Sequence, residues 1–168
     1  IHGSLFKLAG TLRMEGLRIK LDTNGSSPGT IKGLVADGLI DYIAMDVKGP
    51  LNNYKRWCGI NVDTDEIEES IQFILEGRVD YEFRMTVVPF FHRIEDVYEV
   101  AEYLRDAKRF FVQGFRPNNT LNPSFTEIKP FSPQKMEEMK KKVNQILTNR
   151  SQKAECGIQT KSTIHDTR

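Results

Sequence analysis

Cysteine is scarce in this sequence: Cys58 and Cys156 are the only two among 168 residues, and they form no C-x-x-C or related cluster. A disulfide framework is therefore not expected, which fits a reducing cytoplasm. No apolar run is long enough to span a bilayer, and no secretory signal is visible. The formal net charge of +1 predicts no broad attraction to nucleic acid or membranes. The lack of a G-x-G-x-x-G or Walker loop argues against an ordinary nucleotide-binding domain.

What the sequence does contain is typical of a soluble globular protein, with 39% hydrophobic and 28% charged residues. Its length suits one domain but not a complete large barrel. The first residue, Ile1, leads directly into helix-like sequence, so we expect a segment upstream of it to be missing. From residue 149 the chain becomes polar and loses helical periodicity. We therefore expect one domain over residues 1–148 and a polar, disordered tail over residues 149–168.

Helical and strand patterns alternate along the chain. Asp63 is a suitable N-cap and Gly77 a suitable C′ residue for one helix, whereas residues 49–62 indicate an irregular connection. This alternation predicts an α/β fold with a parallel sheet, either half of a doubly wound sheet or the C-terminal part of a (β/α) barrel. Helices are expected over residues 3–15, 31–35, 64–75, 94–104 and 133–147, and strands over 17–21, 42–45, 81–88 and 109–114.

Carboxylates mark the ends of two predicted strands. Asp22 and Thr23 stand in K-L-D-T-N-G, and Asp46 and Lys48 stand in I-A-M-D-V-K. One helical crossover separates these strands, so both ends would face the same side of a parallel sheet, where ligands bind in α/β folds. Asp46 and Lys48 have strand spacing and should point the same way, which would let them grip a zwitterion such as an amino acid. Asp22 and Asp46 together could instead hold a cation through oxygen ligands.

Arg84 interrupts the third predicted strand, Y-E-F-R-M-T-V-V. A parallel strand is expected to be buried on both faces, and a buried guanidinium needs carboxylate partners. Asp22 and Asp46 could supply these, or a ligand carboxylate could. Purely structural interpretations remain open: a turn at Asp22, a surface ion pair of Asp46 with Lys48, and a structural salt bridge at Arg84.

Other polar and aromatic residues near the predicted strand ends carry weaker signals. Gln113 and Arg116 lie at the carboxyl end of the fourth predicted strand and could simply cap it. His92 is expected to be a solvated loop residue. Trp57, beside Cys58, is expected to serve packing rather than to activate a thiol.

In combination, the four strand endings resemble a known family. They are similar to the C-terminal half of radical S-adenosylmethionine (radical SAM) enzymes. The nearest group is the glycyl-radical-enzyme activating proteins, which serve anaerobic ribonucleoside-triphosphate reductase and pyruvate formate-lyase. The spacing matches over residues 1–147, although any one stretch alone would be a weak signal. The matching stretches are K-L-D-T-N-G at 20–25, D-Y-I-A-M-D-V-K at 41–48, Y-E-F-R-M-T-V-V-P at 81–89 and F-V-Q-G-F-R-P at 111–117.

The resemblance implies a fold and a set of cofactor contacts. The fold is a partial (β/α)6 TIM-like barrel, of which this chain would form the C-terminal portion with parallel strands and flanking helices. Asp46, Val47 and Lys48 match a segment that contacts S-adenosylmethionine. Asp22, Thr23 and Asp46 match a monovalent cation site beside the methionine carboxylate.

The resemblance also implies an activity and a partner. Arg84 would face the barrel interior, and Arg116 falls where pyruvate formate-lyase activase has a cofactor-contacting histidine. The intact enzymes are anaerobic oxidoreductases that use S-adenosylmethionine and a [4Fe–4S] cluster to form a 5′-deoxyadenosyl radical. That radical abstracts a hydrogen from a glycine of the partner, a glycyl radical enzyme.

This sequence departs from the family where the cluster is held. It has no C-x3-C-x2-C loop and no G-G-E segment, and Cys58 and Cys156 cannot replace the loop by count or spacing. The isolated chain is therefore expected to be inactive. An alternative is a cluster-less α/β module that keeps a partner- or ligand-binding surface. An incomplete barrel would also expose strand edges, which predicts self-association.

Overall fold

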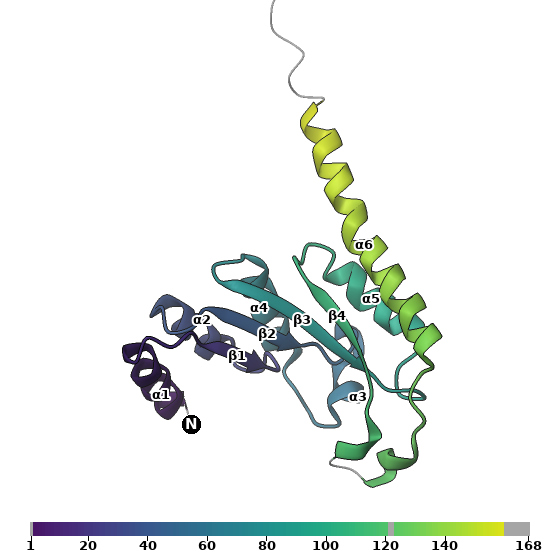
Figure 1. The fold of residues 1–168 in the computed structure, drawn as a ribbon, viewed down its shortest axis with the longest axis horizontal. Helices are drawn as coiled ribbons and strands as arrows, with labels where there is room; N and C mark the ends of the chain where they lie inside the picture. The colour runs from purple at the N-terminus through teal and green to yellow at the C-terminus, as the bar shows by residue number, and fades with distance from the viewer. Residues whose placement is uncertain (1, 121–122, 160–168) are drawn as a thin grey trace, which may run out of the picture.

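The computed structural model describes residues 2–120 and 123–159, and its centre is one sheet of four parallel strands (Figure 1). The register pairs Asp46 with Arg84 and Asp22 with Ala44, so the carboxyl ends of the first three strands lie at one edge of the sheet. The predicted α/β fold with a parallel sheet is confirmed. The strands follow one another in chain order as β1 Lys20–Thr23, β2 Tyr42–Asp46, β3 Asp80–Val87 and β4 Phe110–Gly114.

Helices connect the strands, and α6 runs beside β4 at one end of the sheet (Figure 1). None of the helices in the described part of the chain combines the length and apolar composition that crossing a membrane would require. The α-helices are α1 His2–Met14, α2 Pro28–Ala36, α3 Tyr54–Cys58, α4 Thr64–Leu75, α5 Ile94–Tyr103 and α6 Pro133–Gln159. Three short 3-10 helices are η1 Leu51–Asn53, η2 Pro117–Asn119 and η3 Pro123–Glu127.

The two faces of the sheet differ in character. Along β3, the buried side chains of Tyr81, Phe83 and Met85 alternate with the half-buried side chains of Glu82 and Arg84. The apolar side chains form one core with the inward faces of the helices. The opposite face carries the charged side chains. The expectation that this strand is buried on both faces therefore holds only for its apolar side.

Helix α4 illustrates how the sequence builds the helical layer. Ile67 and Ile71 recur at helical spacing and are buried against the sheet. Asp63 is the N-cap, and its carboxylate accepts a hydrogen bond from the amide of Asp65. Gly77 follows the helix with φ 69°, which suits glycine. The predicted beginning and end of this helix are confirmed.

Two local predictions differ from the structure. The first strand begins at Lys20, whereas the sequence predicts it from Leu17. Leu17 is 51% exposed, because Gly16 with φ 75° ends α1 and the chain turns before it enters the sheet. A short helix, α3, also lies within the predicted irregular connection at 49–62. It is one turn long and closes at Gly59, so no periodic pattern could mark it.

Helix α6 extends past the predicted domain boundary. Its first turns bury Met136, Met139 and Val143, as the spacing predicts. The helix continues to Gln159, so the boundary at residue 148 falls inside it. Residues 160–168 of the predicted tail lie outside the described residues, and the tail remains a prediction.

Candidate functional site

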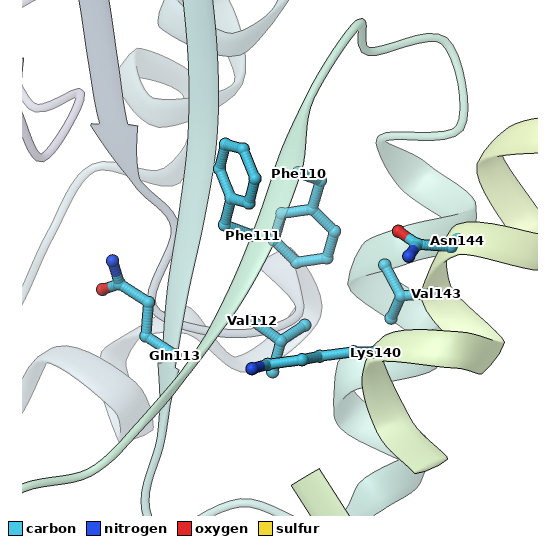
Figure 2. Close-up of a pocket in the computed structure, with 7 residues that line it drawn as sticks. All are labelled: Phe110, Phe111, Val112, Gln113, Lys140, Val143 and Asn144. Carbon is cyan, nitrogen blue, oxygen red and sulfur yellow. The ribbon is translucent and has the colours of Figure 1, made fainter. Parts of the chain in front are cut away.

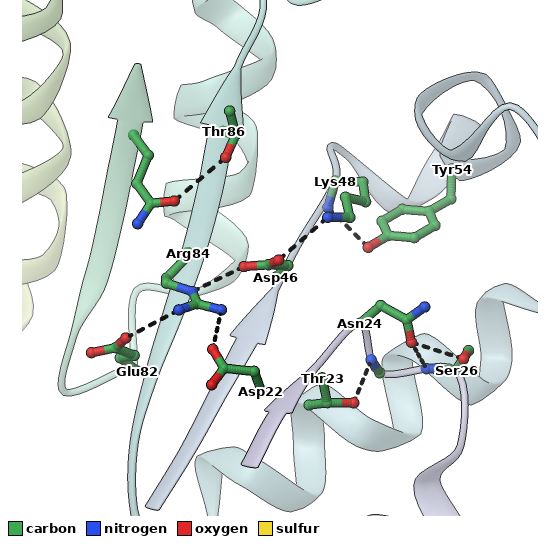
Figure 3. Close-up of polar contacts among 12 residues, drawn as sticks. Asp22, Thr23, Asn24, Ser26, Asp46, Lys48, Tyr54, Glu82, Arg84 and Thr86 are labelled. Atoms are coloured by element: carbon green, nitrogen blue, oxygen red, sulfur yellow. Dashed lines mark hydrogen bonds and ion pairs between the residues drawn. The ribbon is translucent and has the colours of Figure 1, made fainter. Parts of the chain in front are cut away.

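Arg84 joins the ends of β1 and β2 on the charged face (Figure 3). Its Nη2 lies 2.6 Å from Asp22 Oδ1, and its Nε donates to Asp46 Oδ1 at 2.9 Å. Burial opposes the charge, but the hydrogen bonds and charges of Asp22 and Asp46 outweigh it and raise the pKa of Arg84. The predicted carboxylate partners of Arg84 are therefore confirmed, and the guanidinium side chain is only 18% exposed.

The charged network continues along the same face. Glu82 lies two residues before Arg84 and therefore points the same way. One Glu82 oxygen lies 3.9 Å from Arg84 Nη1 and 3.4 Å from Lys20 Nζ, and the other accepts from the Tyr42 hydroxyl at 2.7 Å. Ala44 on β2 is fully buried between these residues. Its small side chain leaves room for Arg84 to reach across β2 to β1.

Lys48 lies just beyond the end of β2 and turns back toward the strand. Its Nζ lies 3.4 Å from Asp46 Oδ2, so the two side chains point the same way, as predicted. Both remain open to solvent, with Lys48 43% and Asp46 39% exposed. An exposed ion pair of this kind contributes little to stability, which leaves it free to bind a ligand.

The charges of this network balance one another. Three carboxylates face three cationic side chains, so the site has no net charge of its own. A balanced site favours a ligand that carries both signs over a simple anion or cation. The members are Asp22, Asp46 and Glu82 against Lys20, Lys48 and Arg84.

Two buried side chains hold the main chain of Lys48. Its amide donates to the Tyr54 hydroxyl oxygen at 2.9 Å, and its carbonyl accepts from His92 Nε2 at 2.8 Å. Burial raises the pKa of Tyr54 to about 12, so the hydroxyl stays neutral. His92 is only 7% exposed and stacks on Trp57 with ring centroids 4.7 Å apart. The prediction of a solvated His92 is wrong, because the turn after β3 folds the ring inward, whereas Trp57 packs as predicted.

The residues beside the two aspartates serve the local backbone. Thr23 Oγ1 accepts from the amide of Gly25 at 3.1 Å, so the turn interpretation holds there. Asp22 instead points to Arg84. Val47 is buried, so a ligand at this edge could meet its main chain but not its side chain. Cofactor contacts at these residues remain predictions.

Arg116 lies apart from this network. It is exposed after β4 and lines a hollow together with Thr86, Gln113 and Lys140. The Thr86 hydroxyl lies 3.4 Å from Gln113 Oε1 in the same region. In the described part of the chain, no ion pair joins Arg116 to the carboxylates at the ends of β1 and β2.

Two further cavities lie beside different elements of the fold. One, of about 380 Å³, adjoins Lys48 at the carboxyl ends of the strands. The other, of about 340 Å³, lies between β4 and α6 (Figure 2). The first is lined by Asn24, Ser26, Lys48, Tyr54, Trp57, Cys58, Ile60, Asn61, Val62, Asp63, Glu66 and Ile67. The second is lined by Phe110, Phe111, Val112, Gln113, Lys140, Val143 and Asn144.

A protein of Methanocaldococcus jannaschii, named "Putative glycyl-radical enzyme activating enzyme MJ1227", is 30% identical to the chain over 129 residues. The chain is homologous to glycyl-radical enzyme activating enzymes. The match covers 74% of the chain and 54% of that protein, so the chain spans about half the length of this curated relative.

The fold of this activase homologue is similar to that of a solved structure. A domain of the pyruvate-formate lyase-activating enzyme from Bacteroides vulgatus superposes with a TM-score of 0.65, over 88% of this chain and 86% of that one. The sequences are 15% identical, so this likeness concerns the fold alone. No family model matches the chain.

The described residues do not fit an iron–sulfur cluster. Among them, no group of three or more His, Cys, Asp or Glu side chains is placed to hold a metal ion. Cys58 is a free thiol whose pKa is raised by burial, and one thiol cannot replace three thiolates. At the predicted cation site, the guanidinium of Arg84 already supplies positive charge to Asp22 and Asp46.

Sequence reasoning did not assign Lys20, Glu82 or Tyr54 to the site, and it placed His92 in solvent. Glu82 had a signal, because E-x-R within an apolar strand puts two charges on one face. Tyr54 and His92 had none, because each side chain contacts a main-chain atom of Lys48, and no residue pattern encodes such a contact.

Proposed function

We propose that this activase homologue forms the C-terminal part of a (β/α)6 radical SAM barrel, and that Asp46 and Lys48 bind the methionine end of S-adenosylmethionine. The observation that carries the proposal is the pair itself: a carboxylate and an ammonium, 3.4 Å apart and partly exposed, at the end of a strand. Asp46 would accept from the amino group of the methionine end, and Lys48 would donate to its carboxylate. The balanced charge of the surrounding network favours such a zwitterion.

The charged face of the sheet supports the barrel. An open parallel sheet is normally covered on both faces, whereas a barrel turns one face inward. Glu82 and Arg84 would then line the interior of the barrel, half-buried and hydrogen-bonded to neighbouring strands. In such barrels the carboxyl ends of the strands form the active site, which is where Asp46 and Lys48 lie.

The neighbouring residues would support the two that bind. Arg84 holds Asp46 Oδ1, which leaves Oδ2 for Lys48 and the ligand. Asp22 keeps the guanidinium in place, so the monovalent cation predicted at Asp22, Thr23 and Asp46 is not needed to balance these carboxylates. Contacts from the Val47 main chain, and from Arg116 to a ligand that extends toward β4, are further parts of the proposal.

The radical chemistry would need more than this chain. In glycyl-radical enzyme activating enzymes, S-adenosylmethionine and a [4Fe–4S] cluster supply the 5′-deoxyadenosyl radical. The described residues hold no ligand set for the cluster, so it would be contributed by protein outside them. The proposed partner is a glycyl radical enzyme, either anaerobic ribonucleotide reductase or pyruvate formate-lyase.

Calorimetric titration with S-adenosylmethionine tests the binding proposal. We expect Lys48→Met to weaken binding about tenfold or more, because a charge-assisted hydrogen bond is lost. Lys32→Met is a matched control, since Lys32 is also 43% exposed and pairs with Glu69 on a different part of the surface. Equal affinity of Lys48→Met and Lys32→Met would contradict the proposal.

A second experiment tests the dependence on an external cluster. The chain, incubated anaerobically with iron, sulfide and a reductant, should form no 5′-deoxyadenosine from S-adenosylmethionine, because it cannot offer three thiolates at one site. Chromatography of the reaction mixture measures the product. Clear turnover would show that the chain is competent alone and would overturn this part of the proposal.

A further inference from the structure

The peptide unit of Lys48 is held on both sides by buried side chains. Tyr54 accepts its amide proton at 2.9 Å, and His92 donates to its carbonyl at 2.8 Å. Tyr54 is 1% and His92 7% exposed, so both partners are fixed in the core. Lys48 lies between buried Val47 and Gly49, so its main-chain groups find their partners within the protein rather than in water.

The hydrogen bonds of His92 define the tautomer of its imidazole ring. Its Nδ1 accepts from the amide of Val88 at 3.0 Å, so Nε2 carries the proton that reaches Lys48. The imidazole is therefore the neutral Nε2–H tautomer. Burial lowers the pKa of His92, while Asp96 of α5 opposes this shift and Arg56 of α3 adds to it.

The surrounding loops are shaped to keep this ring in place. Phe90, in the turn before His92, has φ 66°, a left-handed conformation that a bulky residue rarely adopts. Trp57 covers the ring with an interplanar angle of 12°. A Cβ at Gly49, next to Lys48, would lie 2.6 Å from the Trp57 indole, so the close approach requires glycine. The backbone strain at Phe90 and the close packing at Gly49 both lie beside the stacked rings of His92 and Trp57, which indicates that the position of the His92 ring matters.

We infer that Tyr54 and His92 are positioning residues, which fix the main chain of Lys48 so that its ammonium stays beside Asp46. The inference rests on the proposed function. If Asp46 and Lys48 bind a ligand, a fixed main chain at Lys48 holds the two side chains in their binding arrangement before the ligand arrives. A lysine on an untethered loop would lose side-chain and backbone freedom on binding, and this tether removes the backbone part of that cost.

Tyr54→Phe tests the inference at the amide of Lys48. It removes one oxygen atom, and we expect the Lys48 amide to exchange with solvent at least tenfold faster in NMR spectra. Binding of S-adenosylmethionine should weaken on the order of five- to tenfold, as expected for one lost hydrogen bond. Tyr103→Phe is the matched control, because its hydroxyl contacts Glu68 and Gln72 instead.

His92 is tested by a pair of variants. His92→Phe keeps the ring over Trp57 but removes both hydrogen bonds, and it should weaken binding by a similar factor. His92→Gln retains an amide that can donate to the Lys48 carbonyl, and it should recover part of the loss. As the pH falls and His92 becomes protonated, the wild type should lose affinity for S-adenosylmethionine. His92→Phe should not show this loss, because it has no imidazole to titrate.

The outcomes separate this inference from the proposed function. Unchanged amide exchange and unchanged affinity in Tyr54→Phe and His92→Phe would overturn the inference. Faster exchange with unchanged affinity would also overturn it, because the tether would then be structural only. If neither the wild type nor Lys48→Met binds S-adenosylmethionine, the proposed function fails. The hydrogen bonds of Tyr54 and His92 to Lys48 would then have no ligand to serve.

Discussion

Arg84 is the residue on which the charged face depends, because one guanidinium serves two carboxylates from two strands. Arg84→Met keeps most of the stem but leaves Asp22 and Asp46 without their shared cation. Breaking a fully buried pair costs about 3–5 kcal/mol, and these carboxylates are partly exposed. We therefore expect the free energy of unfolding to fall by about 1–3 kcal/mol, measured by urea denaturation.

Lys32→Met is the control for the loss of unfolding free energy in Arg84→Met. Lys32 Nζ lies 2.6 Å from Glu69, but both side chains are exposed on the helices, and the pair should contribute less than about 1 kcal/mol. Equal destabilisation by Arg84→Met and Lys32→Met would mean that the Arg84 bridge behaves as an ordinary surface ion pair.

His92 should make stability depend on pH. Burial lowers its pKa in the folded state, whereas the unfolded chain titrates near 6.5. Its contribution is therefore complete above pH 6.5 and is lost as the pH falls through the folded-state pKa. Denaturation between about pH 7.5 and about pH 5.5 should show a steeper decline in the wild type than in His92→Phe. Parallel declines would contradict the assignment of a neutral, buried imidazole.

At the residue scale, the sequence predicted the contacts that follow from strand geometry. Alternation along a strand put Asp46 and Lys48 on one side, and the cost of an unpaired charge pointed Arg84 to Asp22 and Asp46. It could not predict the burial of His92, because the partners of this ring are the main-chain atoms of Val88 and Lys48, and no residue pattern encodes them. Contacts to the backbone depend on how loops pack, which spacing does not report.

Among the elements, the turn from β1 into α2 passes close to the side chain of Met45 on β2. Gly25 has φ 82°, and a Cβ there would overlap the side chain of Met45. Gly25→Ala should cost about 2–4 kcal/mol of unfolding free energy, from left-handed strain and overpacking together. Gly38→Ala, at φ 64° with open space, isolates the strain and should cost about 1–2 kcal/mol.

Thermal and urea denaturation of these two variants would measure the difference. Equal losses would mean that the neighbourhood of Gly25 yields easily and that packing against β2 does not fix this turn. A greater loss in Gly25→Ala would tie the turn that contains Thr23 to the core of the sheet.

Elements were predictable where caps and periodicity agree, as in α4 between Asp63 and Gly77. The first strand was placed too early because Leu17 is apolar yet exposed. Just before the strand, the carboxylate of Asp41 accepts from the amide of Ile19 at 2.7 Å. That hydrogen bond is the main reason that the pKa of Asp41 is lowered. The turn at Gly16 thus overrides the local apolar signal of Leu17.

For the whole molecule, the edges of the sheet lead to a prediction about assembly. Within the described residues, β1 and β4 each pair with one neighbouring strand and leave their other side without a strand partner. Unpaired parallel edges favour association between chains. We expect sedimentation velocity to detect dimers or larger species that increase with concentration. A single monomeric species at high concentration would contradict this expectation.

The central claim concerns where S-adenosylmethionine binds, and two of the cavities in the structure offer contrasting sites. One adjoins Lys48 at the strand ends, and the other lies between β4 and α6. A chemical-shift map of the isotope-labelled chain during titration with S-adenosylmethionine tests the claim directly. The account predicts the largest changes at Asp46, Val47 and Lys48. Changes confined to residues around Phe111 and Lys140, or no saturable change at all, would contradict it.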